Sequence, residues 1–171
     1  MFAIAITLLV LDLHVPVYGT GHGPLTHRLG EEWPAYVAYT VSFAVIGIMW
    51  VNHHTLLLRC EEVSRRLVSA NLLLLGIVAA LPFTTSLFAE YVRDTGNDGH
   101  VAAAVYGASM LAAAIGFNVL AWCVVPRPHM LRFSAGIFLY AGTIVVAFVN
   151  APASLAVHGA IATYYAFDQL R

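Results

Sequence analysis

Four side chains that can ionise stand inside or beside apolar stretches, where such residues are uncommon and often functional. They are Asp12, the adjacent pair His53 and His54, and His158. Histidines from facing helices can ligate haem, so His53 or His54 with His158 forms one hypothesis for a cofactor site. Neighbouring residues on a helix point about 100° apart, so His53 and His54 do not face one metal ion together. His158 is expected at a different depth from His53, which favours hydrogen bonding between helices instead.

Asp12 and His158 are also the side chains that could titrate in a proton-coupled or cation-coupled transporter. Such carriers usually place a charged or broken-helix site near the middle of the membrane. Asp12 follows the first apolar segment and is expected near the outer interface, where it would attract cations from water. The sequence contains no evident nucleophile–base pair, paired carboxylates or phosphate-binding loop, so we expect no enzyme.

The composition indicates whether the chain is surrounded by water or by lipid. Hydrophobic residues make up 60% of the 171 positions and charged residues 10%, with a mean hydropathy of +0.80. Soluble domains usually carry about 25% charged residues. The chain is therefore predicted to be an integral protein of the lipid bilayer. Its formal net charge of −1 argues against nucleic acid as a partner. Cys60 and Cys123 have no metal-binding or disulfide spacing.

Recurring apolar segments predict a single domain, residues 1–171, built as an all-α bundle of six membrane helices. The expected helices are Phe2–Leu13, Pro34–Leu58, Leu67–Glu90, Val101–Val125, Phe133–Val149 and Ala153–Phe167. A loop rich in Gly, Pro and His follows the first helix, "RCEEVSRR" is expected to be helical, and "YVRDTGNDGH" is expected to be a turn. The first helix is shorter than the roughly 20 residues that a span needs. It has neither the basic start nor the cleavage site of a signal peptide.

The distribution of arginine predicts the orientation of the bundle. One set of connections, with the C-terminus, holds six arginines and the other set holds two. The first set is Arg59, Arg65, Arg66, Arg127, Arg132 and Arg171, and the second is Arg28 and Arg93. Because basic residues concentrate on the cytoplasmic side, we expect a multi-pass protein of the cell membrane with both termini in the cytoplasm.

The first helix carries bulky apolar residues at positions i, i+4 and i+7, namely Ile4, Leu8 and Leu11. This spacing places them on one helix face, spread over roughly 10 Å of axis. Thr7 lies beside that face, about one turn after Ile4. By spacing alone, contact with lipid or with a neighbouring helix is the ordinary interpretation, and pore lining is the alternative.

Three stretches together resemble one family. "FAIAITLLVLDLHVP", "WVNHH" and "NLLLLGIVAALPFTTSLFAEY" are similar to segments of the prokaryotic relatives of the lysosomal potassium channel called transmembrane protein 175. The resemblance implies a homotetramer in which the first helix of each subunit lines a central pore. Ile4, Leu8 and Leu11 would form the hydrophobic constriction and gate, Thr7 would line the pore, and Asp12 would stand at its outer mouth.

The same resemblance implies a weakly selective cation channel that passes hydrated or partly hydrated K+ and needs no cofactor. It also implies a polar network between helices at Trp50, His53 and Asn71, because relatives carry an Arg-x-x-x-Phe-Ser-Asp motif upstream that contacts such groups. The chain starts after the place of that motif, so the resemblance leads us to expect a first helix that lacks its initial turns.

Overall fold

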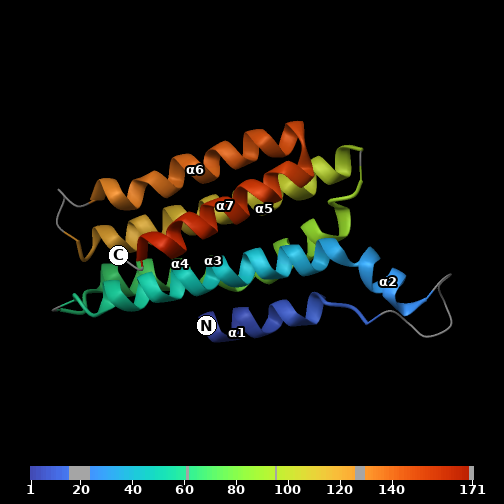
Figure 1. Cartoon of the computed structure of the whole chain (residues 1–171). Coiled ribbons are helices and arrows are strands. Elements are labelled where there is room, and N and C mark those ends of the chain that lie inside the picture. The colour runs from blue at the N-terminus through green and yellow to red at the C-terminus, as the bar shows by residue number, and fades with distance from the viewer. Residues whose placement is uncertain (16–23, 61, 95, 126–129, 170–171) are drawn as a thin grey trace.

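A computed structural model of the chain describes residues 1–15, 24–60, 62–94, 96–125 and 130–169, with only the backbone for residues 12, 130–134 and 166–169. The elements are α1 (Phe2–Leu8), the 3-10 helix η1 (Leu9–Asp12), α2 (Leu25–Glu31), α3 (Trp33–Leu57), α4 (Arg65–Tyr91), α5 (Asn97–Trp122), α6 (Met130–Val149) and α7 (Ala151–Gln169). No strand occurs in the part of the chain that the structure describes. The long helices run side by side as an elongated bundle (Figure 1).

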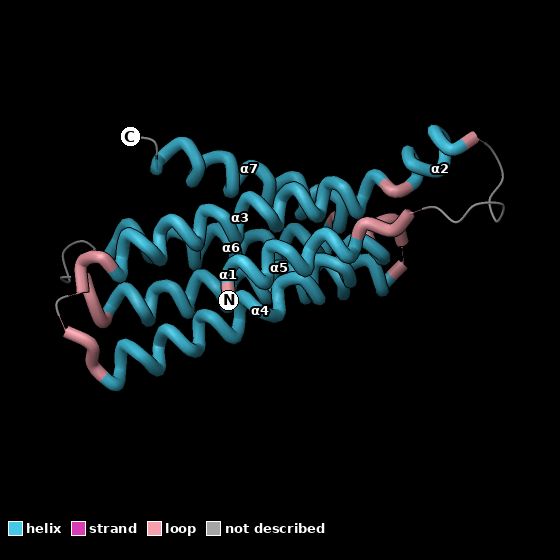
Figure 2. Tube along the Cα trace, turned by 90° about the horizontal axis from the view of Figure 1, so that it is seen from below, coloured by secondary structure: helices cyan, strands magenta, loops and turns pink. Residues whose placement is uncertain are grey.

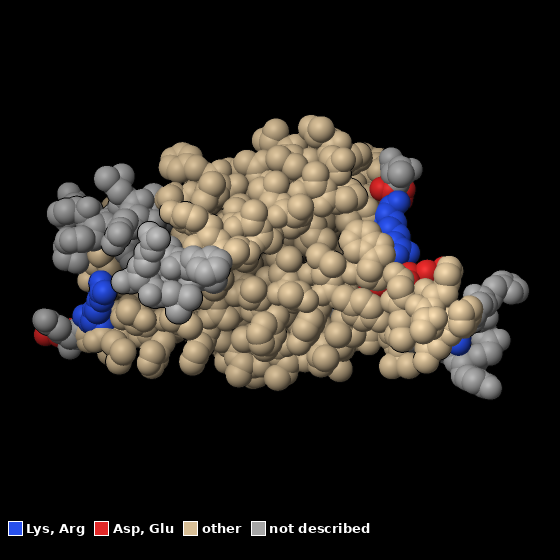
Figure 3. Space-filling view, in the orientation of Figure 1, with Lys and Arg blue, Asp and Glu red and all other residues tan. Residues whose placement is uncertain are grey.

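The bundle has the charge distribution of a membrane protein. Within the described residues, α3, α4 and α5 are long and apolar enough to cross a bilayer, and the segments Phe2–Leu11 and Ala135–Val149 are shorter apolar helices. Charged side chains gather at the two ends of the bundle, and the surface between them is free of charge in the face shown (Figure 3). The all-helical, apolar fold predicted from composition is therefore confirmed.

Small residues allow the central helices to approach closely. α5 packs against α4 and α6, and Gly116 of α5 faces α4. A Cβ atom at Gly116 would lie 3.2 Å from Cδ1 of Ile77, so a larger residue there would press against α4. Large side chains fill the remaining core, including Leu74, Phe88 and Tyr106, all fully buried. Close contact through Gly and Ala is the packing that membrane helices favour.

The structure corrects the prediction for the first helix. The α-helix ends at Leu8, and η1 continues it as a 3-10 helix to Asp12. The expected loop after it contains the short helix α2, which the sequence analysis missed. α1 and η1 lie along the outside of the bundle against α3 and α4 (Figures 1 and 2).

The connections differ from the predictions at two places. The segment between α3 and α4 is not helical in its described residues: α3 ends with the bond from Cys60 N–H to the Leu57 carbonyl, and Ser64 has the extended backbone of a helix cap before α4. The expected polar turn after α4 is also shorter, since α5 already begins at Asn97. Asn150 separates α6 from α7: its side-chain oxygen accepts a hydrogen bond from the Ala153 N–H at 2.9 Å and caps the start of α7.

Candidate functional site

The first helix buries one face against the rest of the chain. Phe2, Ala5 and Leu9 are 5%, 1% and 0% exposed and belong to the hydrophobic core. The Phe2 ring lies against the His53 ring of α3, with 5.1 Å between the ring centroids. The spacing i, i+3 and i+7 keeps these three residues on one stripe, and that stripe fixes the rotation of α1 about its own axis.

The three predicted constriction residues share the opposite face of α1 and η1. Ile4, Leu8 and Leu11 are 57%, 42% and 70% exposed, so much of each side chain is left uncovered by the described part of the subunit. Thr7 is exposed as well, and its hydroxyl donates a hydrogen bond to the Ile4 carbonyl at 2.9 Å. That bond uses the hydroxyl hydrogen within the helix, so only oxygen lone pairs remain for a partner outside it.

The change from α-helix to 3-10 helix aligns two of these side chains. In a 3-10 helix, residues three apart eclipse one another, whereas in an α-helix they diverge by about 60°. Leu8 precedes η1 and Leu11 lies within it, three residues later. η1 therefore brings the Leu11 side chain closer to the line of Leu8 than a continued α-helix would. Asp12 is the last residue of η1, and its side chain lies outside the described structure.

Two of the three residues assigned to the polar network meet. Nε2 of His53 in α3 lies 2.6 Å from Oδ1 of Asn71 in α4, which is hydrogen-bonding distance and joins the two helices that support α1. Trp50 does not join this pair. Its side chain is 52% exposed and stacks on His54, with 6.1 Å between the ring centroids. Among the described residues, the three predicted members therefore meet only at the pair His53 and Asn71, which packs beside Phe2, and the wider network stays a prediction.

A buried group of hydroxyls connects α3, α4 and α5. Ser42 Oγ lies 2.8 Å from Thr85 Oγ1 and 3.0 Å from the Tyr106 hydroxyl. Thr85 in turn donates to the Leu81 carbonyl at 2.8 Å. The sequence analysis did not identify this group. A signal was available, because every hydroxyl inside an apolar span needs a partner.

An acidic pocket of about 190 Å³ lies near the point where η1 ends. It is lined by His14 beyond η1, by Glu31 and Glu32 before α3, and by Glu90 and Arg93 at the end of α4, among other residues. Arg93 also donates to the Glu31 carbonyl and lies over the Trp33 ring. This end of the bundle therefore gathers carboxylates, which attract cations.

A different cavity, of about 380 Å³, lies inside the subunit between α3, α5, α6 and α7. Its lining is mostly apolar, with Asn52, Asn118 and Arg59 among the polar members. No acidic side chain of the described residues lines it. A coupled carrier needs a site for its ion, and the described lining of this cavity offers no carboxylate for one.

The histidines proposed as haem ligands face different neighbours. His53 contacts Phe2 and Asn71, on the side of α1 and α4. His158 is fully buried between the rings of Tyr106 and Tyr140, and its Nδ1 lies 2.7 Å from the Ser154 carbonyl. The described residues contain no group of three or more His, Cys, Asp or Glu suited to a metal ion. His53 and His158 thus share no neighbour among these contacts.

Comparison with known proteins gives a consistent picture. The sequence model of the family described as the endosomal/lysosomal potassium channel TMEM175 matches residues 1–82. A potassium channel from Streptomyces collinus is 46% identical over 184 residues, which cover 99% of this chain and 88% of that protein. The TMEM175 protein of Gallus gallus, named as an endosomal/lysosomal proton channel, is 35% identical over 105 residues, 57% of this chain and 21% of that protein.

The fold matches a solved structure as well. The crystal structure of a lysosomal potassium-selective channel TMEM175 homolog from Chamaesiphon minutus superposes with a TM-score of 0.90. The two chains are 36% identical, and the match covers 98% of this chain and 91% of the other.

Proposed function

Since the chain belongs to the TMEM175 family of ion channels, we propose that it forms a potassium-permeable, weakly selective cation channel. The family consists of channels and not of enzymes. In the proposed assembly, four subunits surround one axis and turn the exposed face of α1 and η1 toward it. Closed cyclic symmetry is the ordinary way to bring identical helices around a shared pore.

The observation that carries this proposal is the division of α1 into two faces. Phe2, Ala5 and Leu9 hold the helix against α3 and α4, and the opposite face stays largely exposed among the residues that the structure describes. That face carries Ile4 and Leu8, with Leu11 brought toward the line of Leu8 by η1. Four copies would form stacked apolar rings, with the oxygen of Thr7 between them.

Apolar rings offer an ion no ligand to replace its hydration water. A narrow hydrophobic neck conducts while it is wet and closes when it dries, so the rings would act as the gate. Ions would cross at least partly hydrated, which makes selectivity modest. K+ holds its water less tightly than Na+ and would lose part of it at lower cost. Small rotations of α1 would widen or narrow the neck.

The charges at the two ends of the bundle fit a cation pore with its mouth at the end of η1. Glu31, Glu32 and Glu90 stand near the end of η1, where Asp12 is assigned to the outer mouth. Carboxylates around a low-dielectric opening raise the local concentration of cations. The proposed topology has six spans and both termini in the cytoplasm of a cell-membrane protein. The excess of arginine on the connections at the other end supports it.

The first test is K+ flux into proteoliposomes for the wild type, Leu8→Ala and Leu11→Ala. Leu139→Ala is the matched control, because Leu139 of α6 and Leu8 are both 42% exposed. Trimming a ring lowers the barrier to wetting, so both α1 variants should raise the K+ flux several-fold or lower the preference for K+ over Na+. Leu139→Ala should match the wild type.

Size-exclusion elution would first establish that each variant keeps the wild-type assembly. With assembly intact, equal flux and equal ion preference in all four proteins would refute the pore assignment of α1. The cation-coupled carrier would then become the leading hypothesis, and the internal cavity beside Asn52 and Asn118 the place to look for its substrate.

A further inference from the structure

A groove lies at the end of the bundle where α4 begins and α5 ends. We name it the α4–α5 groove. It is lined by Ser64, Arg65, Arg66, Ser69, Ala70, Leu73, Val119, Trp122 and Cys123. It is separate from α1 and from the acidic pocket, which lies at the opposite end of α4. None of the residues assigned to the pore, its outer mouth or the polar network belongs to it.

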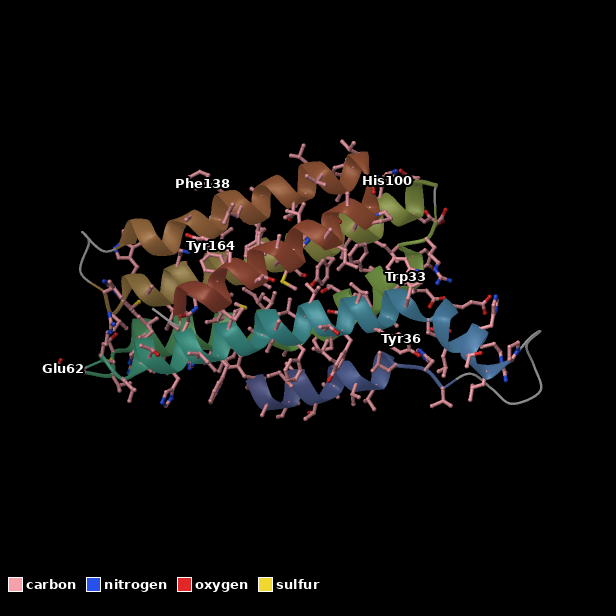
Figure 4. All side chains as sticks on the ribbon, viewed as in Figure 1. Trp33, Tyr36, Glu62, His100, Phe138 and Tyr164 are labelled. Atoms are coloured by element: carbon pink, nitrogen blue, oxygen red, sulfur yellow. The ribbon has the colours of Figure 1, made fainter. Side chains whose placement is uncertain are left out.

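The head of the groove is basic. Arg65 and Arg66 are both exposed, and neither is paired with a carboxylate in the described part of the chain. Ser64 and Ser69 add hydroxyl groups beside them. Among the residues described, no Asp or Glu lines the groove, and Glu62 projects from the end of the bundle (Figure 4). Two adjacent guanidinium groups with hydroxyls favour a phosphate group as their partner.

The length of α4 places this basic head at the surface of the membrane. α4 has 27 residues and so measures about 40 Å, whereas the hydrocarbon core of a bilayer is about 30 Å thick. The first turn of the helix therefore extends into the headgroup layer. Trp122 is the last residue of α5 and is 66% exposed, and tryptophan is enriched at this interface.

The body of the groove is apolar and lies deeper. Leu73 stands eight residues after Arg65, about 12 Å further along α4, and is 54% exposed. Val119 on α5 faces the same groove and is 39% exposed. A soluble phosphate would occupy the arginines and leave this wall uncovered. A lipid would satisfy both parts, with its phosphate on the arginines and an acyl chain along Ala70, Leu73 and Val119.

We propose that the α4–α5 groove of each subunit binds one anionic glycerophospholipid from the surrounding leaflet. Basic pockets between membrane helices are suited to such headgroups. The arginines would recognise the negative charge, the apolar wall would select a lipid over a free anion, and Trp122 would mark the depth of the glycerol region. The inference goes beyond ion conduction, and its test does not depend on flux.

The test is native mass spectrometry of the detergent-purified full chain, titrated with phosphatidylglycerol or phosphatidylcholine of the same acyl chains. Glycerol phosphate, which has the anionic group without the chains, serves as the soluble competitor. The variant is Arg65→Gln with Arg66→Gln. The matched control is Arg59→Gln, because Arg59 is exposed on the neighbouring α3–α4 link and lines the internal cavity instead of the groove.

Wild type and Arg59→Gln should retain phosphatidylglycerol in preference to phosphatidylcholine, and glycerol phosphate should not displace it. The double variant should bind phosphatidylglycerol about 25-fold more weakly, the product of two roughly fivefold losses, one for each arginine. An equal loss in Arg59→Gln would attribute binding to general surface charge and overturn the site. Displacement of phosphatidylglycerol by glycerol phosphate would overturn the lipid site and show that the groove binds simple anions. Loss of the oligomer in the double variant, with no lipid retained by the wild type, would assign the groove to a neighbouring subunit.

Discussion

Replacing Ser42 with alanine should destabilise the bundle more than replacing its partner Tyr106 with phenylalanine. Both substitutions break the Ser42–Tyr106 hydrogen bond, and Ser42→Ala also breaks the bond between Ser42 and Thr85. Each hydroxyl has one hydrogen to donate. Thr85 donates its hydrogen to the Leu81 carbonyl, so Ser42 must donate to Thr85, and Tyr106 must donate to Ser42. The Leu81 carbonyl, which can only accept, therefore fixes the direction of donation along the row.

The direction of hydrogen-bond donation determines how much stability each substitution costs. Ser42→Ala leaves the O–H of Tyr106, which is fully buried, without an acceptor. A buried unsatisfied polar group costs about 1–3 kcal/mol, while hydrogen bonds between membrane helices average about 0.6 kcal/mol. We expect a loss of about 1–2 kcal/mol for Ser42→Ala. Tyr106→Phe removes the donor itself and leaves Ser42 bonded to Thr85, so it should cost about 0.5–1 kcal/mol.

The double variant separates this reasoning from simple loss of contacts. Once Tyr106 is phenylalanine, no donor remains to be orphaned, so adding Ser42→Ala should cost less than it does in the wild type. The free energy of unfolding would be measured by SDS titration in mixed micelles, followed by circular dichroism. Additive losses, or a larger loss for Tyr106→Phe than for Ser42→Ala, would refute the assigned direction.

Two further pairs of variants test the packing of α1 and the start of α5. Ala5→Leu adds bulk to the buried face of α1 and should lower the free energy of unfolding by about 1–3 kcal/mol. Ala3→Leu lies on the exposed side and should change that free energy by less than about 0.5 kcal/mol. Equal effects of the two substitutions would contradict the assigned faces. Gly99→Ala would place a Cβ atom onto the Asp94 carbonyl oxygen and should lower the melting temperature clearly. Gly47→Ala has open space around it and should leave that temperature unchanged or raise it, since alanine favours helix by about 1 kcal/mol.

Much of the fold follows from the sequence because long apolar runs have few alternatives. The bounds predicted for α3, α4 and α5 agree with the structure to within four residues. α2 was not predictable in this way: it has seven residues and follows Pro24, so it offers too little periodicity to be told from a loop. The switch from α-helix to η1 also leaves no pattern, because both helix types accept the same residues.

The site was predictable only in part. The spacing of Ile4, Leu8 and Leu11 is enough to place them on one face, but not to say that this face stays uncovered. That depends on Phe2 meeting His53, a contact between residues distant in sequence. The same limit explains Trp50, which stands three residues before His53 yet stacks on His54.

The hydroxyl chain through the core also has a consequence for proton movement. A proton can hop along hydroxyls only if the far end releases one and every O–H then turns back. Here the far end is the Leu81 carbonyl, which also accepts from Thr84 at 3.1 Å and cannot pass a proton onward. The hydrogen-bonded row from Tyr106 to Leu81 therefore cannot conduct protons, and its role is to hold α3, α4 and α5 together.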